Sequence, residues 1–89
     1  MIDSNSNLKF YNKKKVFTPT QTTKFLYNGI VRNISKMHNI SLADMGCGNG
    51  IIGISLYKNL KNIKDVYFSD VSKEAISTCK KNVKINRLK

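Results

Sequence analysis

The stretch that decides the fold is residues 40–53, which read ISLADMGCGNGIIG. A short apolar-biased segment, Ile40 to Met45, stops at a cluster of glycines, and apolar residues resume at Ile51. A buried strand that turns through glycines into a helix brings bare backbone N–H groups and the positive end of the helix close to a ligand. The stretch therefore predicts a strand, a ligand-binding glycine loop, and a helix that ends near residues 59–62.

Further elements alternate on the C-terminal side of this unit. Residues 65–70, DVYFSD, are rich in β-branched and aromatic residues and predict a second strand. Ser72 is expected to cap a following helix that carries Glu74 in its positive first turn. The inner face of this helix is expected to consist of Ile76, Cys79 and Val83. Such alternation favours a parallel sheet with right-handed crossovers. We therefore predict an α/β fold, a Rossmann-like three-layer sandwich with parallel strands that is truncated after its first two sheet strands.

An N-terminal segment precedes the first strand, and the chain divides near Ile40. Residues 18–21, TPTQ, combine a capping Thr, a Pro at the first helical position and a Gln at the third, which predicts the start of a helix. Apolar residues then recur at helical spacing, and the helix is expected to run to about Met37. Its buried face is expected to contain Phe25, Leu26, Ile30, Ile34 and Met37.

Composition limits the chain to one small domain of 89 residues. It has 16 Lys and Arg against 5 Asp and Glu, a net charge of +11, with basic clusters near both ends. Such clusters attract nucleic-acid phosphates, although a general lysine bias would leave them simply solvated. With no signal peptide or membrane span in the sequence, we expect a cytoplasmic protein without a membrane partner. Cys47 and Cys79 lack the companions of a disulfide framework or a metal site and are expected to be reduced thiols.

An acidic residue, Asp70, stands at the end of the second predicted strand. Asp70 lies 20 positions after Gly50, where an acid in such folds accepts hydrogen bonds from ribose hydroxyls. Residues 44–50, DMGCGNG, and the segment that starts at Asp70 resemble the two cofactor motifs of the class I S-adenosylmethionine-dependent methyltransferases. Residues 16–26 are similar to the segment before that signature in the small-methyltransferase branch, which includes release-factor glutamine and nucleic-acid N-methyltransferases.

This resemblance implies a division of the chain and a set of site residues. Residues 1–39 would be an N-terminal preamble and helix, and residues 40–89 the cofactor-binding first half of a methyltransferase domain. The implied cofactor is S-adenosyl-L-methionine. The implied binding residues are Asp44, Gly46, Cys47, Gly48, Gly50, Asp70 and Val71. The glycines would admit the methionine part, Asp44 would orient the loop, and Asp70 would hold the ribose. Because the sulfonium is already an activated donor, no catalytic residue is assigned.

The methyl acceptor is expected to bind elsewhere. The family's Asn-Pro-Pro-Tyr-like motif, which holds a target nitrogen, is not among these residues, whose only proline is Pro19. We therefore expect the chain alone to be incomplete and inactive. It is expected to be completed by another chain or to self-associate. The expected methyl acceptor is a nitrogen of a protein or a nucleic acid.

Two alternatives stay open at this point. Residues 48–53, GNGIIG, satisfy the nicotinamide-binding fingerprint of an oxidoreductase, although Asp44 and the extra Gly46 argue against it. A non-catalytic basic module that binds nucleic acid or a protein partner is the second alternative.

Overall fold

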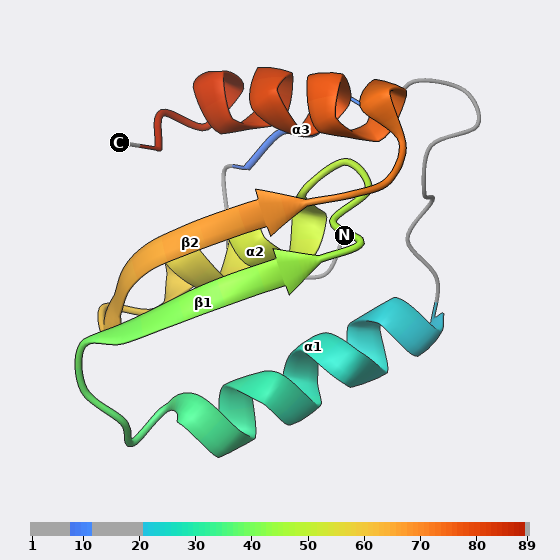
Figure 1. Cartoon of the computed structure of the whole chain (residues 1–89). Helices are drawn as coiled ribbons and strands as arrows, with labels where there is room; N and C mark the ends of the chain where they lie inside the picture. The colour runs from blue at the N-terminus through green and yellow to red at the C-terminus, as the bar shows by residue number, and fades with distance from the viewer. Residues whose placement is uncertain (1–7, 12–20, 89) are drawn as a thin grey trace.

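The computed structural model describes residues 8–11 and 21–88, apart from the side chain of Thr22. Its elements in chain order are α1 (Gln21–Ile34), β1 (Ile40–Met45), α2 (Ile51–Asn59), β2 (Ile63–Ser69) and α3 (Lys73–Ile85), as Figure 1 shows. The two strands pair in parallel, and α2 crosses between them. The predicted α/β, Rossmann-like arrangement with parallel strands is confirmed.

The two faces of the sheet differ. Register places Asp44 beside Phe68, and both side chains lie against Gly53 of α2. The alternate positions of both strands point the other way, because successive side chains of a strand face opposite sides. On that second face Met45 is 79% exposed and Tyr67 is 64% exposed. The described residues therefore form two layers of the predicted three-layer sandwich, a sheet and the helices packed on one of its faces.

The core is centred on α2. Ile51, Ile54 and Leu56 are at most 3% exposed, and α2 contacts both strands and both other helices. Leu56 is buried, while Ile52 and Leu60 are half-buried against the core cluster. Burial on nearly all sides of α2 explains why apolar residues occupy most of its positions.

The observed inner face of helix α1 agrees with the expected one at Ile30, which packs against the core cluster, and at the half-buried Ile34, and it differs elsewhere. Its buried side chains are Thr23 and Tyr27, whereas Phe25 is 76% exposed and Leu26 is 52% exposed. The hydroxyl of Tyr27 accepts a hydrogen bond from Asn59 Nδ2 at 2.9 Å and donates to the carbonyl of Ser55 at 3.4 Å. A buried tyrosine that finds polar partners on α2 thus determines which side of α1 faces the core.

The end of α1 also differs from the prediction. The helix stops at Ile34, and Met37 lies outside it, 51% exposed. The amide of Asn62 donates to the carbonyls of Ile34 and Met37 at 2.7 and 2.8 Å, which ties the end of α1 to the turn before β2. The expected helix start at residues 18–21 lies largely outside the described residues, which resume at Gln21.

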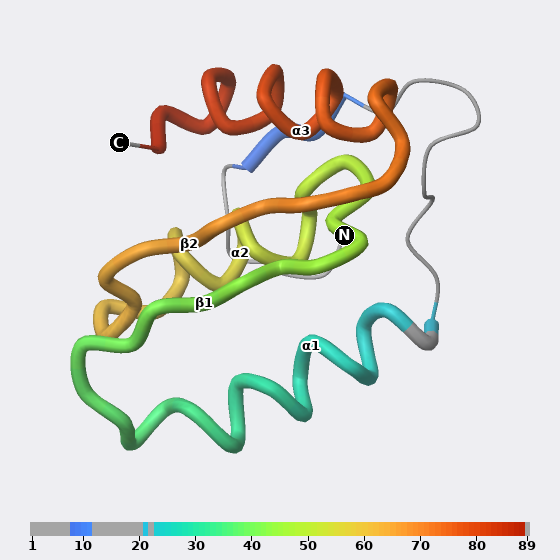
Figure 2. Tube along the Cα trace, viewed as in Figure 1, coloured from blue at the N-terminus to red at the C-terminus, as the bar shows by residue number. Residues whose placement is uncertain are grey.

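Helix α3 begins as expected. The hydroxyl of Ser72 accepts a hydrogen bond from the N–H of Ala75 at 3.1 Å, which confirms the predicted N-cap. Cys79 is buried, whereas Ile76 and Val83 are half-buried and line a cavity of about 570 Å³ beside β2. Residues 8–11 lie along α3, as the blue segment in Figure 2 shows. In the part of the chain that the structure describes, no helix has the length and apolarity needed to cross a bilayer.

Candidate functional site

The glycine loop follows β1 and folds back onto the end of β2. Gly46, Gly48 and Gly50 have φ values of +72°, +56° and +86°, a region that residues with a Cβ rarely adopt. The N–H groups of Gly46 and Cys47 both donate to the carbonyl of Ser69, at 2.7 and 2.9 Å. The loop is therefore tied to the neighbouring strand before it enters α2.

Close packing explains two glycines and leaves a third open. A Cβ at Gly50 would lie 2.7 Å from Cys79 Sγ, and one at Gly53 would lie 2.5 Å from the Phe68 ring. Around Gly46, by contrast, a Cβ would meet no described atom within 4 Å. Gly50 lets α3 approach the loop and Gly53 lets the sheet approach α2, whereas the backbone at Gly46 faces open space.

Asp70 directly follows β2 and bridges the loop to α3. Its Oδ2 accepts from the N–H of Gly48 at 3.0 Å and its Oδ1 accepts from the N–H of Ser72 at 2.9 Å. These two backbone donors, Ser72 more than Gly48, hold the pKa of the carboxyl below its usual value. Asp70 is thus ionised at neutral pH, and each of its oxygens keeps acceptor capacity for a hydroxyl group.

Asp44 closes the loop from the inside. Its Oδ2 accepts from the N–H of Gly53 at 3.1 Å, which ties the end of β1 to the first turn of α2. Burial raises the pKa of Asp44, the Gly53 N–H opposes that rise, and the charge of Asp70 adds to it. Because Asp44 Oδ2 points into the protein toward Gly53, this carboxylate is placed to orient the loop and not to exchange a proton with a ligand.

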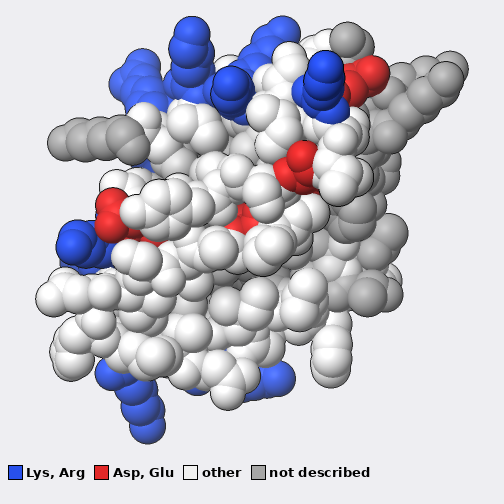
Figure 3. Space-filling view, viewed as in Figure 1, with Lys and Arg blue, Asp and Glu red and all other residues white. Residues whose placement is uncertain are grey.

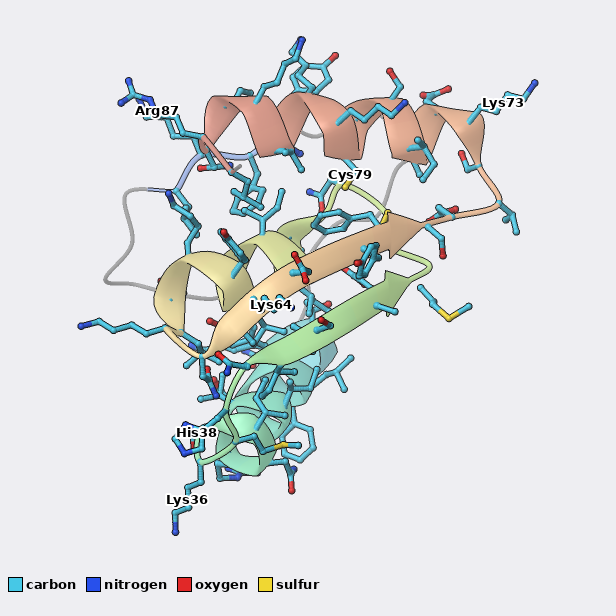
Figure 4. The ribbon with its side chains drawn as sticks, turned by 60° about the vertical axis from the view of Figure 1, so that its left-hand side comes forward. Lys36, His38, Lys64, Lys73, Cys79 and Arg87 are labelled. Carbon is cyan, nitrogen blue, oxygen red and sulfur yellow. The ribbon has the colours of Figure 1, made fainter. Side chains whose placement is uncertain are left out.

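The two cysteines lie inside the site region. Cys47 and Cys79 are 6% and 2% exposed, and Figure 4 shows Cys79 on the side of α3 that faces the sheet. Burial raises the pKa of both thiols above the ordinary value. Both are free thiols that stay protonated at neutral pH, which makes neither of them an effective nucleophile.

The structure brings most of the predicted site residues to one end of the sheet. Hydrogen bonds join Asp44 to the first turn of α2 and Asp70 to the loop, while Val71 stands beside Asp70 with a fully exposed apolar side chain. His38 lies with Lys36 at the far end of the molecule from Cys79 (Figure 4).

Sequence reasoning missed two buried amides of this region, Asn49 and Asn82. Asn82 donates to the carbonyl of Asn49 at 2.8 Å and is 0% exposed. A polar residue on the inner face of α3, between Cys79 and Val83, was the one available signal. Nothing in the local sequence indicates its partner, because the two asparagines are 33 positions apart.

Basic side chains gather over α3. Figure 3 shows blue Lys and Arg atoms along that helix and a mostly uncharged surface over the sheet. Lys73, Lys80 and Lys84 are separated by seven and four residues, so they lie along one side of the helix. They form a line of positive charge whose nearest acidic neighbour on the helix is Glu74.

Comparison with known proteins gives consistent matches. The family model described as "Methyltransferase small domain" matches residues 7–89. The release factor glutamine methyltransferase of Flavobacterium psychrophilum is 37% identical over 84 residues, which is 91% of this chain and 29% of that protein. The ribosomal RNA large subunit methyltransferase G of Shewanella loihica is 36% identical over 56 residues, 63% of this chain and 14% of that protein.

A solved structure agrees with these sequence matches. The crystal structure of a ribosomal protein L11 methylase from Lactobacillus delbrueckii subsp. bulgaricus superposes with a TM-score of 0.69 at 30% identity. It covers 82% of this chain, and the match takes in 36% of that protein's chain. The present chain spans less than a third of the length of the two curated relatives named above.

Proposed function

The chain belongs to the methyltransferase small domain family, and we propose that it forms the part of a methyltransferase that binds S-adenosyl-L-methionine. The observation that carries this proposal is the Asp70 carboxylate held against Gly48 of the glycine loop at 3.0 Å. This contact places the Asp70 carboxylate, which can accept hydrogen bonds from hydroxyl groups, beside the glycine backbone that a ligand can approach. The family assignment also removes the support for the nicotinamide alternative.

The residues present fit such a nucleoside ligand. Asp70 has remaining acceptor capacity for ribose hydroxyls, the exposed side chain of Val71 offers an apolar surface for a base, and Gly46 leaves open space beside the backbone. Asp44 would act indirectly, by holding the loop through Gly53. Gly48, Gly50 and Cys47 would shape the loop, Cys47 as a small buried side chain.

The chemistry divides between ligand and protein. When bound, the sulfonium supplies an activated methyl group, which needs little acid or base assistance. The residues described here bind and orient that donor. Alignment of an acceptor with the methyl carbon is the remaining requirement, and it provides much of the rate enhancement in such transfers.

We propose a protein or nucleic-acid nitrogen as the methyl acceptor. A release factor glutamine methyltransferase and a ribosomal RNA methyltransferase are both among the relatives. We place acceptor binding outside these 89 residues and expect no methyl transfer from them alone. A completing chain or self-association would cover the open face of the sheet, where Met45 and Tyr67 are exposed. A cytoplasmic location fits the buried free thiols.

Calorimetry with three ligands tests the cofactor assignment. We expect the chain to bind S-adenosylmethionine and S-adenosylhomocysteine and to bind NAD more weakly. Tighter binding of NAD than of either methionine-derived ligand would reject the proposal. So would the absence of binding to all three by a chain that shows a cooperative thermal unfolding transition.

Nucleic acid is a second candidate ligand because of the line of lysines on α3. Each lysine that neutralises an RNA phosphate releases a counterion, so the affinity for RNA should fall steeply with salt. We expect the double variant Lys80→Glu/Lys84→Glu to weaken binding of a 20-nucleotide RNA and to flatten the salt dependence. The matched control is Lys36→Glu/Lys58→Glu, which changes the net charge equally on other parts of the chain. Equal losses in the two double variants would show attraction by net charge alone.

A further inference from the structure

A buried amide at position 82 connects two parts of the chain that are far apart in sequence. Asn82 Nδ2 donates to the carbonyl of Tyr11 at 2.7 Å and to that of Asn49 at 2.8 Å, while its Oδ1 accepts from the N–H of Tyr11 at 2.6 Å. The side chain is 0% exposed. Both donors and one acceptor position of the amide are therefore satisfied inside the protein.

Asn86, which directly follows α3 and lies one turn beyond Asn82, repeats two of these three hydrogen bonds. Its Oδ1 accepts from the N–H of Lys9 at 3.0 Å, and its Nδ2 donates to the carbonyl of Lys9 at 2.8 Å. Two asparagines at i and i+4 thus bind alternate residues of an extended segment, as a neighbouring strand would. We refer to residues 8–11 as the N-terminal strap, which lies beside α3 in Figure 2.

Only Asn82 of this pair also holds the glycine loop. The Asn49 carbonyl that it binds belongs to the same rigid peptide group as the N–H of Gly50, which donates to Cys47 at 2.8 Å. The other side of Asn49 is fixed as well, because its Oδ1 accepts from the N–H of Ile51 at 3.2 Å. Asn82 therefore sets the orientation of the peptide group that lies between Gly48 and α2.

We propose that Asn82 is a positioning residue for the cofactor loop and that it couples the docking of the N-terminal strap to the affinity for the cofactor. The proposal rests on the proposed binding of S-adenosylmethionine. Without the Asn82 amide, the buried Asn49 carbonyl loses its partner, and a buried carbonyl without a partner is costly. The peptide group would then turn toward water, and the bond from Gly50 to Cys47 would break with it.

The test compares Asn82→Ala with Asn86→Ala. Both changes delete a buried amide that contacts the strap, and both remove the two hydrogen bonds to one residue of the strap. Asn86→Ala also removes the bond from Asn86 Nδ2 to the carbonyl of Asn82 at 2.9 Å, which closes the end of α3. We expect the affinity for S-adenosylhomocysteine to fall about tenfold or more in Asn82→Ala and less than about threefold in Asn86→Ala, measured by calorimetry below the unfolding transition of each variant. A purely structural role for Asn82 predicts similar affinities in the two variants, and that result would overturn the proposal.

A measurement without ligand separates this proposal from the cofactor assignment. In ligand-free chains, the backbone amide resonances of Gly48 and Gly50 should move in Asn82→Ala and stay near their wild-type positions in Asn86→Ala. If the wild-type chain bound no cofactor, the functional proposal would fail, and the proposed coupling would fail with it. If the wild-type chain bound the cofactor but Asn82→Ala bound it equally well, the positioning role alone would be wrong.

Hydrogen exchange in the wild-type chain provides a test if Asn82→Ala does not fold. Coupling between two sites is reciprocal, so a cofactor that orders the loop must also favour the docked strap. We expect S-adenosylhomocysteine to slow exchange of the Tyr11 N–H, which binds Asn82, more than that of the Lys9 N–H, which binds Asn86. Equal effects on both N–H groups, or none, would contradict the coupling.

Discussion

The glycine loop, residues 46–50, and helix α1 are held in different ways. The loop is bound by polar groups from three places: the Ser69 carbonyl, the Asp70 carboxylate and the Asn82 amide. Helix α1 packs mainly on α2 and leaves Phe25 and Leu26 largely exposed. Hydrogen bonds among the described residues thus fix the shape of the candidate site, whereas the described residues cover only part of the apolar surface of α1. Pairs of substitutions in the two regions test this difference.

The largest effect is expected from Gly50→Ala in the loop. The new Cβ would meet Cys79 Sγ at 2.7 Å on a backbone with φ of +86°. Left-handed strain costs about 1–2 kcal/mol, and overpacking adds about 1–3 kcal/mol. A loss of about 2–5 kcal/mol would remove much of the stability of a small domain. Urea denaturation measures it, and a change of less than about 1 kcal/mol would show that the loop is not held as tightly as its contacts indicate.

The next effect concerns ligand binding rather than stability. Asp70→Ala should weaken binding of S-adenosylhomocysteine by about tenfold to a hundredfold, because ribose hydroxyls would lose a charged acceptor and the Gly48 N–H would lose its partner. The matched control is Asp65→Ala on β2, whose carboxylate accepts a 3.4 Å hydrogen bond from the Ser41 hydroxyl, away from the loop. Calorimetry on both folded variants decides the matter. Similar affinities would remove Asp70 from the site.

The order of elements could be read from local patterns, and the site contacts could not. The strand before the glycines, the Ser72 cap and the acid after β2 each depend on neighbouring residues, so the sequence predicted them well. The expected buried face of α1 was wrong at Phe25, Leu26 and Met37, which are exposed, whereas Ile30 packs against the core cluster as expected. The spacing of apolar residues did not reveal the buried Tyr27, whose hydroxyl bonds to α2. The amide of Asn82 was missed because both of its partners lie more than 30 positions away.

A smaller effect of opposite sign is expected in α1. Gly29 lies inside the helix, and a Cβ there would meet no described atom within 4 Å. Gly29→Ala should therefore raise the free energy of unfolding by about 1 kcal/mol, since alanine loses less backbone entropy in a helix. The same urea experiment measures it, beside Gly50→Ala. A loss of stability in Gly29→Ala would show that this side of α1 packs more closely than the structure indicates.

The smallest effect is a difference in pH dependence between the two carboxylates of the site. Burial raises the pKa of Asp44, so the folded state binds this proton more tightly than the unfolded state. The cost of charging Asp44 is therefore fully present at neutral pH and is relieved as the pH falls through the raised pKa. Asp70 has a lowered pKa, so its contribution is lost only at more acidic pH, below the ordinary value of 3.8.

Asp44→Asn isolates the first of these titrations. An asparagine keeps an oxygen that can accept from the Gly53 N–H, so the tie between β1 and α2 can persist without the charge. We expect the variant to be at least as stable as the wild type at pH 7 and to lose this advantage as the pH falls toward 4. The difference between the two urea midpoints is the quantity to follow, because the two chains differ only at position 44. If the difference between the urea midpoints stayed constant between pH 7 and 4, the Asp44 carboxyl would be as well solvated in the folded chain as in the unfolded one. The inner side of the loop would then be open to water.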